Sequence, residues 1–545
     1  MPNDRRSMKR LAGALESEAQ RAQTSLKATG HPRPYFVSYL LRDSESHWFN
    51  ARFGTTFGEE HRRWRRCYAD VRVGSYRHDQ VSEGGLDDNS DKAESYAYGA
   101  IPEGSMLDGV IAGVWQLTEA RYREAAEDYL DRRVDQLHYR DPNPHFVSWE
   151  RRDPIVDHSM PSFPDVDSNA WARYVRAASA CGKREDGLFV CEVDLNVRHV
   201  TKVFVSTEGT SLIERYPFWQ LSVFLELISK KGVTMPWSFS ELVRDPSELP
   251  DLGALKRRIA RSVAQMRKLS EAPTLRAYSG PVLLDPGPAG LLMHEALGHR
   301  LEGNRLLSTG EGQTFKDAVG ETLLPSAISM YDDPTRAELE GRSLIGHYRY
   351  DDEGVPSGRA NLVERGKIEG FLTSRAGISR RHRSNGHSRN ESFERPMSRM
   401  GVTVVEAADP LDDLALKARL IAEVKARKLP FGVHVLIADS GETATKSYDF
   451  QAFLGQIKAA TRVYPDGREQ LVRDVSFVGT PLNAVRAIVA AGTRQGLDNS
   501  YCGAESGSVP VSTIAPALLV DNLELQSSAP TPHAAHTYPL PWWRE

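Results

Sequence analysis

Hydrophobic and polar positions along the first half of the chain predict a mixture of helices and strands. Residues 8–28 are rich in Ala, Glu, Arg and Gln and predict a surface helix, and residues 106–137 keep the helical period over one long helix or two consecutive ones. The alternating stretches PYFVSYLL (34–41) and CYADVRVGSY (67–76) predict strands. Residues 187–216 predict two or three more, with a turn at Glu208-Gly209.

The second half predicts mostly β structure. A helix over 251–272 with one apolar stripe is followed by a short apolar strand, YSGPVLL, and then by a helix whose first residue we place at Pro288 and whose end we place at Gly303-Asn304. Further on, short β runs and Gly turns dominate, with helical interruptions at 410–428 and 481–491. No internal repeat is visible.

These elements predict an α+β chain of two domains, because 545 residues exceed what one core accommodates. We expect a mixed α/β domain over 1–275, a β-rich domain over 276–525 that carries the helix beginning at Pro288, and an extended Pro-rich tail over 526–545.

Composition excludes several function classes. Hydrophobic residues make up 40% and charged residues 26%, and the formal net charge of -4 disfavours binding to nucleic acid or an anionic membrane. No uncharged apolar run reaches membrane-spanning length, so we expect a cytoplasmic protein. The four cysteines form no CxxC pair, which argues against a disulfide framework. The GxSxG, P-loop and GxGxxG motifs are absent.

The segment LLMHEALGHRLEGN carries the candidate chemistry. His294 and His299 are five residues apart, so on a regular α-helix they would diverge by roughly 140°. They can bind one ion only if the helix widens to the π spacing or unwinds at Gly298, where either distortion costs least. Given that distortion, imidazole suits zinc, and Glu295 is placed to take a proton from a metal-activated water. The third ligand is either Glu302 or Cys502, and the residue types alone do not choose between them.

The segment HEALGHRLEGN resembles the HExxxH signature of the TldD/PmbA family of metallopeptidases, and later segments such as SNGHSRNESFERPMSRM and YCGAESGSVPVSTIAPALLVDNLEL resemble that family in the same order. The resemblance implies that His294, His299 and Cys502 bind Zn²⁺, that Glu295 is the general base, and that Glu302 lies beside the ligands or at the helix end. It also implies a β-rich catalytic half, and a homodimer or a heterodimer with a relative lacking the motif, around an internal chamber.

Two positions depart from the family pattern. Asn304 replaces an Asp, although an amide keeps one acceptor oxygen. Residues 504–507, Ala-Glu-Ser-Gly, replace the usual Lys-x-Gly-Gln, which removes a cation and adds a carboxylate near the site and leaves room for a changed substrate preference.

The remaining candidates have weaker patterns. The run RRHRSNGHSRNE (380–391) is typical of a solvated loop, although one of Arg380, Arg381 or Arg389 could meet a substrate carboxylate. Four histidines lack a ligand spacing and are interpreted as surface residues: His382, His387, His533 and His536.

The sequence therefore predicts a zinc-dependent peptidase that hydrolyses unfolded or short peptides, since a chamber would exclude folded chains. The alternatives are a non-catalytic partner subunit or peptide-binding protein of the same family, and an amide hydrolase that acts on a peptide natural-product precursor.

Overall fold

The structure is a computed structural model that describes most of the chain. The described residues are 5–81, 101–104, 106–139, 146–308, 310–379, 382–392, 394–443, 445, 453–479, 481–528, 535, 536, 538 and 540. Most of the expected tail, including His533, therefore lies outside the described residues. Mixed α and β structure is present, as predicted, and strands predominate in the second half.

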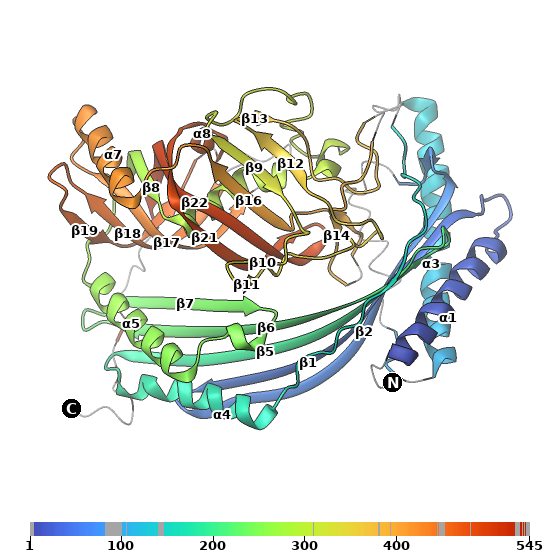
Figure 1. Cartoon of the computed structure of the whole chain (residues 1–545), viewed down its shortest axis with the longest axis horizontal. Coiled ribbons are helices and arrows are strands. Elements are labelled where there is room, and N and C mark those ends of the chain that lie inside the picture. Colours follow the sequence, from blue (N-terminus) through green and yellow to red (C-terminus); the bar gives the residue numbers. More distant parts are fainter. Residues whose placement is uncertain are drawn as a thin grey trace.

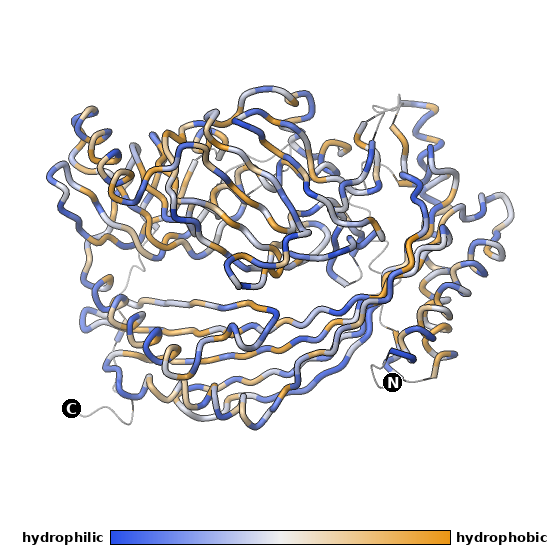
Figure 2. Tube along the Cα trace, viewed as in Figure 1, coloured by the Kyte–Doolittle hydropathy of each residue, from blue (hydrophilic) through white to orange (hydrophobic). Residues whose placement is uncertain are grey.

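A sheet of seven strands occupies the first half, in the order β3-β2-β1-β5-β6-β4, with β7 beside β6. The bounds are β1 Pro34–Arg52, β2 Thr55–Ser75, β3 His78–Asp79, β4 Val156–His158, β5 Leu188–Ser206, β6 Ser211–Ile228 and β7 Thr234–Val243. Hydrophobic and hydrophilic residues alternate along the long strands (Figure 2). β1 and β2 are longer than the predicted stretches, because the mostly polar residues at 42–47 and 59–66 also pair across the ladder.

Two helical layers cover one face of this sheet at opposite ends (Figure 1). α1 (Arg5–Ser25) and the single long helix α3 (Leu107–His138) pack on one end, where Val37, Tyr39 and Leu41 of β1 are buried. α4 (Ser168–Ser179), the short 3₁₀ turn η2 (Ala180–Arg184) and α5 (Leu252–Ser270) pack on the other end, over Phe49 and Ala51. Another 3₁₀ turn, η3, covers Pro246–Glu248.

The second half is built on an eleven-stranded sheet. Five of its strands close on themselves, because β8 pairs with β17, β17 with β18, β18 with β20, β20 with β22, and β22 again with β8. The bounds are β8 Tyr278–Leu284, β9 Ile328–Asp332, β12 Ala360–Glu364, β13 Lys367–Ile368, β16 Val402–Ala407, β17 Gly432–Thr443, β18 Phe453–Val463, β19 Glu469–Val472, β20 Val475–Phe477, β21 Ile488–Ala504 and β22 Gly507–Ser527. Two small pairs lie outside it: β10 Glu338–Leu339 with β11 Arg342–Ser343, and β14 Ser388–Arg389 with β15 Met397–Ser398.

Among the described residues of this half, the α-helices are α6 (Pro286–Met293), α7 (Asp413–Ala426) and α8 (Pro481–Arg486). The predicted helix over 481–491 is wrong in its second part. The chain enters β21 at Ile488, which pairs with Val520 of β22, because this apolar stretch gains a buried ladder. α6 begins at Pro286 rather than at Pro288, since Asp285 takes the N-cap position.

The long strands of the first half curve beneath the second half (Figure 1). Ion pairs cross between them, with Arg42 bound to Asp352 at 2.8 Å and Arg375 bound to Glu208 through one guanidinium nitrogen at 2.7 and 2.8 Å. A cavity of about 120 Å³ lies along this interface. Among the described residues, every helix is too short or too polar to traverse a lipid bilayer.

Candidate metal centre

α6 continues directly into the widened turn that the sequence predicts. After Met293 the chain forms a π turn, η4, over His294–Gly298, in which the His299 N–H donates to the carbonyl of His294, five residues back. Two short 3₁₀ turns follow, η5 (His299–Leu301) and η6 (Gly303–Leu306). The helical path ends at Glu302, whose backbone is extended, one residue before the predicted Gly303-Asn304 stop.

Gly298 serves a different purpose from the one predicted. Its φ of -50° and ψ of -58° are open to any residue, so the glycine's extra backbone freedom is not used. A Cβ at this position would lie 2.1 Å from Sδ of Met400. Glycine is therefore required here because the π turn packs closely against Met400.

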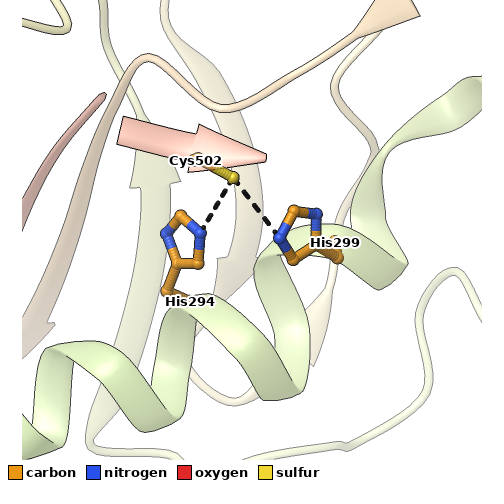
Figure 3. A group of neighbouring side chains, drawn as sticks. All are labelled: His294, His299 and Cys502. Carbon is orange, nitrogen blue, oxygen red and sulfur yellow. Dashed lines mark hydrogen bonds between the residues drawn. The ribbon is translucent and has the colours of Figure 1, made fainter. Parts of the chain in front are cut away.

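The π turn brings His294 and His299 to one sulfur (Figure 3). Nε2 of His294 lies 3.2 Å from Sγ of Cys502, and Nε2 of His299 lies 3.4 Å from the same atom. Cys502 is on β21, opposite Val509 of β22, and all three side chains are buried. The two rings stand at 88° to each other, and both direct Nε2 toward the Cys502 sulfur.

The spacing of these donors fits a zinc ion. With a Zn–S distance near 2.3 Å and a Zn–N distance near 2.0–2.1 Å, tetrahedral coordination places sulfur and nitrogen roughly 3.5 Å apart. The observed separations of 3.2 and 3.4 Å lie just below this value. Thiolate with imidazole is a donor set that zinc prefers, and three protein ligands leave a fourth position for water.

Charge within the cluster favours the ligand form of the thiol. Burial would raise the pKa of Cys502, but the neighbouring His299 and His294 lower it well below its usual value. Burial would lower the pKa of each histidine, yet the Cys502 sulfur raises the pKa of both, and Glu302 raises that of His299 further. These shifts favour a thiolate beside protonated imidazoles, and a cation can replace those protons.

Glu302 is the centre of a charged chain that leads away from the ligands. Its carboxylate lies 3.2 Å from Nδ1 of His299 and accepts a hydrogen bond from Nε of Arg305 at 3.0 Å. Burial would raise the pKa of Glu302, but His299 and Arg305 lower it to about 2. Arg305 also binds Glu311 and Glu505. The carboxylate that residues 504–507 add is therefore paired with Arg305, which it shares with Glu302 and Glu311.

Arg399 is a site residue that the sequence did not indicate. Its Nη2 donates to the Cys502 carbonyl at 2.6 Å and to Sγ at 3.3 Å, and its Nη1 donates to Ser506 Oγ and the Gly507 carbonyl. A fixed cation beside a thiolate stabilises its charge. No spacing rule connects residues 399 and 502, so only the fold could identify this contact.

Two of the histidines interpreted as surface residues are not on the surface. His387 is fully buried, and its Nε2 lies 3.2 Å from Asp332, whose carboxylate also accepts from the Gly401 and Val402 N–H groups. The pair thus holds the backbone at the start of β16, the strand that follows Arg399. His382 is half-buried against the Ser374 carbonyl, whereas His536 is exposed.

Glu295 and Asn304 occupy opposite ends of the distorted segment. Glu295 is buried in the same π turn as His294. Asn304 Oδ1 accepts hydrogen bonds from the Ser398 N–H, from the Ser398 hydroxyl and from the Ser374 hydroxyl, at 2.9, 2.6 and 3.1 Å. Its acceptor oxygen therefore accepts hydrogen bonds that an Asp carboxylate at this position could also accept.

The predicted solvated loop at 380–391 is partly buried. Arg380 and Arg381 lie outside the described residues, but Arg389 is buried and donates to the Met400 carbonyl. Arg389 also lines the 120 Å³ cavity, together with Arg198 of the first sheet and with Val509, the ladder partner of Cys502.

Comparison with known proteins matches residues 277–527 to the family model of the PmbA/TldA metallopeptidase C-terminal domain. A metalloprotease of Methanothermobacter thermautotrophicus is 26% identical over 62% of this chain and 70% of its own length. A Haemophilus influenzae metalloprotease described as a TldD homolog is 30% identical over 45% of this chain and 47% of its own length. A zinc metalloprotease TldD homolog of Saccharolobus solfataricus is 24% identical over 46% of this chain and 52% of its own length. The chain thus spans about half the length of the Haemophilus and Saccharolobus relatives.

Two solved structures share the fold over nearly the whole chain. TldE from Thermococcus kodakarensis has a TM-score of 0.62 at 12% identity and covers 96% of this chain and 100% of its own. A Thermotoga maritima protein described as a candidate modulator of a DNA gyrase has a TM-score of 0.61 at 15% identity and covers 95% and 100%. The likeness extends to the first half, beyond the part that the family model matches.

Proposed function

We propose that the chain, whose C-terminal half resembles the PmbA/TldA metallopeptidases, is a zinc-dependent peptidase in which His294, His299 and Cys502 hold the ion and Glu295 is the general base. The observation that carries the proposal is the convergence of two Nε2 atoms on one buried sulfur across a π turn. A π turn is rare and is often found at functional sites.

The residues beside the three proposed ligands have different roles. Bound zinc supplies Lewis-acid polarisation of a water molecule and of the scissile carbonyl. Glu295 takes a proton from the attacking water and passes it to the leaving amine. Glu302 orients the His299 ring through Nδ1, so that Nε2 is free for the ion. Arg399 donates to the Cys502 sulfur and fixes its position.

The substrates we propose are short or unfolded peptides. Arg389 lines a cavity beside the ladder that carries Cys502, together with Arg198 and Arg244, and no described carboxylate forms an ion pair with any of these three arginines. A guanidinium in such a cavity recognises a carboxylate well. Arg389 thus receives a carboxylate of the peptide, such as its free C-terminus.

The assembly we propose is a dimer, formed with a second copy or with a relative that lacks the motif. The support is the resemblance of residues 277–527 to the PmbA/TldA metallopeptidase C-terminal domain. Size measurement of the purified chain, alone and after expression with such a relative, distinguishes these arrangements.

Digestion of a peptide library by the zinc-loaded chain tests the activity. Wild type cleaves unstructured peptides, and Glu295→Gln keeps about one zinc at this centre but loses the cleavage, because the amide cannot accept the proton. Glu16→Gln, on the distant helix α1, is the matched control and cleaves as wild type does. Equal turnover by wild type and Glu295→Gln would reject Glu295 as the base. Absence of zinc from wild type would reject the metal centre.

A further inference from the structure

A second group of metal-type side chains lies on the first sheet, far along the chain from the centre described above. Glu45 and His47 are on β1, and His61 is on β2. His47 and His61 face each other directly across the antiparallel ladder, and Glu45 lies two residues before His47, so all three project from the same face.

This face is the one that the helices cover at its two ends. Val37, Tyr39 and Leu41 pack under α1 and α3, and Phe49 and Ala51 pack under α4 and α5. Glu45 and His47 have the same parity and fall between the two groups. Their side chains remain 24% and 18% exposed, and that of His61 is 52% exposed, so solvent and ions reach the cluster.

The three donor atoms already converge. Nε2 of His61 lies 2.8 Å from Oε1 of Glu45, Nε2 of His47 lies 3.8 Å from the same oxygen, and all three atoms lie within 4.8 Å of one another. Zinc bound by two imidazoles and a carboxylate in tetrahedral geometry separates its donors by roughly 3.3 Å. These two distances lie on either side of that value, and the two Nε2 atoms lie within 4.8 Å of each other, so rotations of the side chains complete the site.

Binding one ion requires one of the two rings to turn. The rings of His47 and His61 stack at a centroid distance of 4.3 Å and an angle of 10°, so their in-plane lone pairs run nearly parallel, and the more exposed His61 ring rotates out of the stack to meet the ion. Arg63 contacts the other carboxylate oxygen, Oε2, at 3.4 Å. Oε1 is thereby left directed at the two imidazoles.

We propose that Glu45, His47 and His61 form a second divalent-metal site, which binds zinc and joins β1 to β2 where neither helical layer covers them. Two imidazoles and one carboxylate also suit Ni²⁺ and Cu²⁺, but not Mg²⁺ or Ca²⁺, which prefer oxygen ligands. With three protein ligands and partial exposure, the site exchanges its ion readily, unlike the buried centre at Cys502.

Equilibrium dialysis of the full chain against Zn²⁺ tests the site, using single variants that separate it from the buried centre. Wild type takes up two equivalents of zinc. His61→Gln, an exposed position that folds normally, takes up one, and His294→Gln also takes up one. His138→Gln, at the exposed end of α3, is the matched control and takes up two.

X-ray absorption at the zinc edge gives a second readout. Zinc bound to His294→Gln shows nitrogen and oxygen neighbours without sulfur, whereas zinc bound to His61→Gln shows sulfur. Two equivalents in His61→Gln, or none in His294→Gln, would overturn the proposal. Uptake of one equivalent by wild type that is lost in His61→Gln but kept in His294→Gln would support this site and reject the centre at Cys502.

Discussion

The Glu302 carboxylate lies 3.2 Å from Nδ1 of His299, on the side of the ring opposite the Cys502 sulfur. One nitrogen of the imidazole is thus held by a buried carboxylate while the other is directed at the ligand cluster. Partners of this kind fix the orientation of a ligand ring and increase its basicity.

Glu302→Gln should weaken zinc binding about 10- to 100-fold, because the amide holds the His299 ring less firmly and lacks the negative charge that increases the basicity of the ring. Competition with a chelator of known affinity measures the change. Glu311→Gln is the matched control, since Glu311 also binds Arg305 but does not contact His299. Equal affinities of the two variants would contradict the role of Glu302.

Cys502→Ala should lose most of the zinc of the buried centre, because it removes the only sulfur of the three-donor set. Metal analysis after dialysis against a weak chelator measures the loss. Cys67→Ala, another buried cysteine on β2, should retain the metal. If Cys502→Ala kept all of the zinc at the buried centre, the thiolate would be excluded as a ligand.

Gly298→Ala should disrupt the π turn, since its Cβ would lie 2.1 Å from Met400 Sδ, and overpacking of this kind typically costs about 1–3 kcal/mol. We expect lower zinc affinity, measured by chelator competition. The double variant Gly298→Ala/Met400→Ala should recover part of that affinity, because the clashing side chain is gone. Gly287→Ala in α6, where a Cβ would meet nothing, is the control.

Zinc affinity at the buried centre should fall as the pH decreases from 8 to 6. The Cys502 sulfur raises the pKa of His294 and of His299 above the usual 6.5, so protons compete for both Nε2 atoms already near neutral pH. The thiol contributes little in this range, because its pKa is lowered. Displacement of one to two protons gives about a 10- to 100-fold change per pH unit. A flat profile would contradict the charge assignment.

Arg389→Gln should raise KM for peptides with a free C-terminal carboxylate and leave KM for the amidated peptides unchanged, because only the former present an anion to the guanidinium. Arg389 also donates to the Met400 carbonyl, so thermal unfolding of the variant is measured alongside. An equal rise in KM for both kinds of peptide would assign Arg389 a structural role.

The sequence by itself determined the local features of this protein. The five-residue spacing of His294 and His299 required a widened turn if they were to meet, and η4 is that turn. Alternation and helical periodicity located most elements, because side-chain polarity along a short segment follows its own geometry. They failed at 481–491, where a tertiary ladder with β22 outweighed helical propensity.

Only the tertiary structure decided which distant residues surround the histidines. Arg399 and Cys502 are separated by 103 residues, and Arg305 and Glu505 by 200, so no local pattern links them. The same holds for His47 and His61, whose meeting depends on the register of β1 against β2. Strand register is set by burial and by turns elsewhere in the sheet, which is why these contacts are invisible in the sequence.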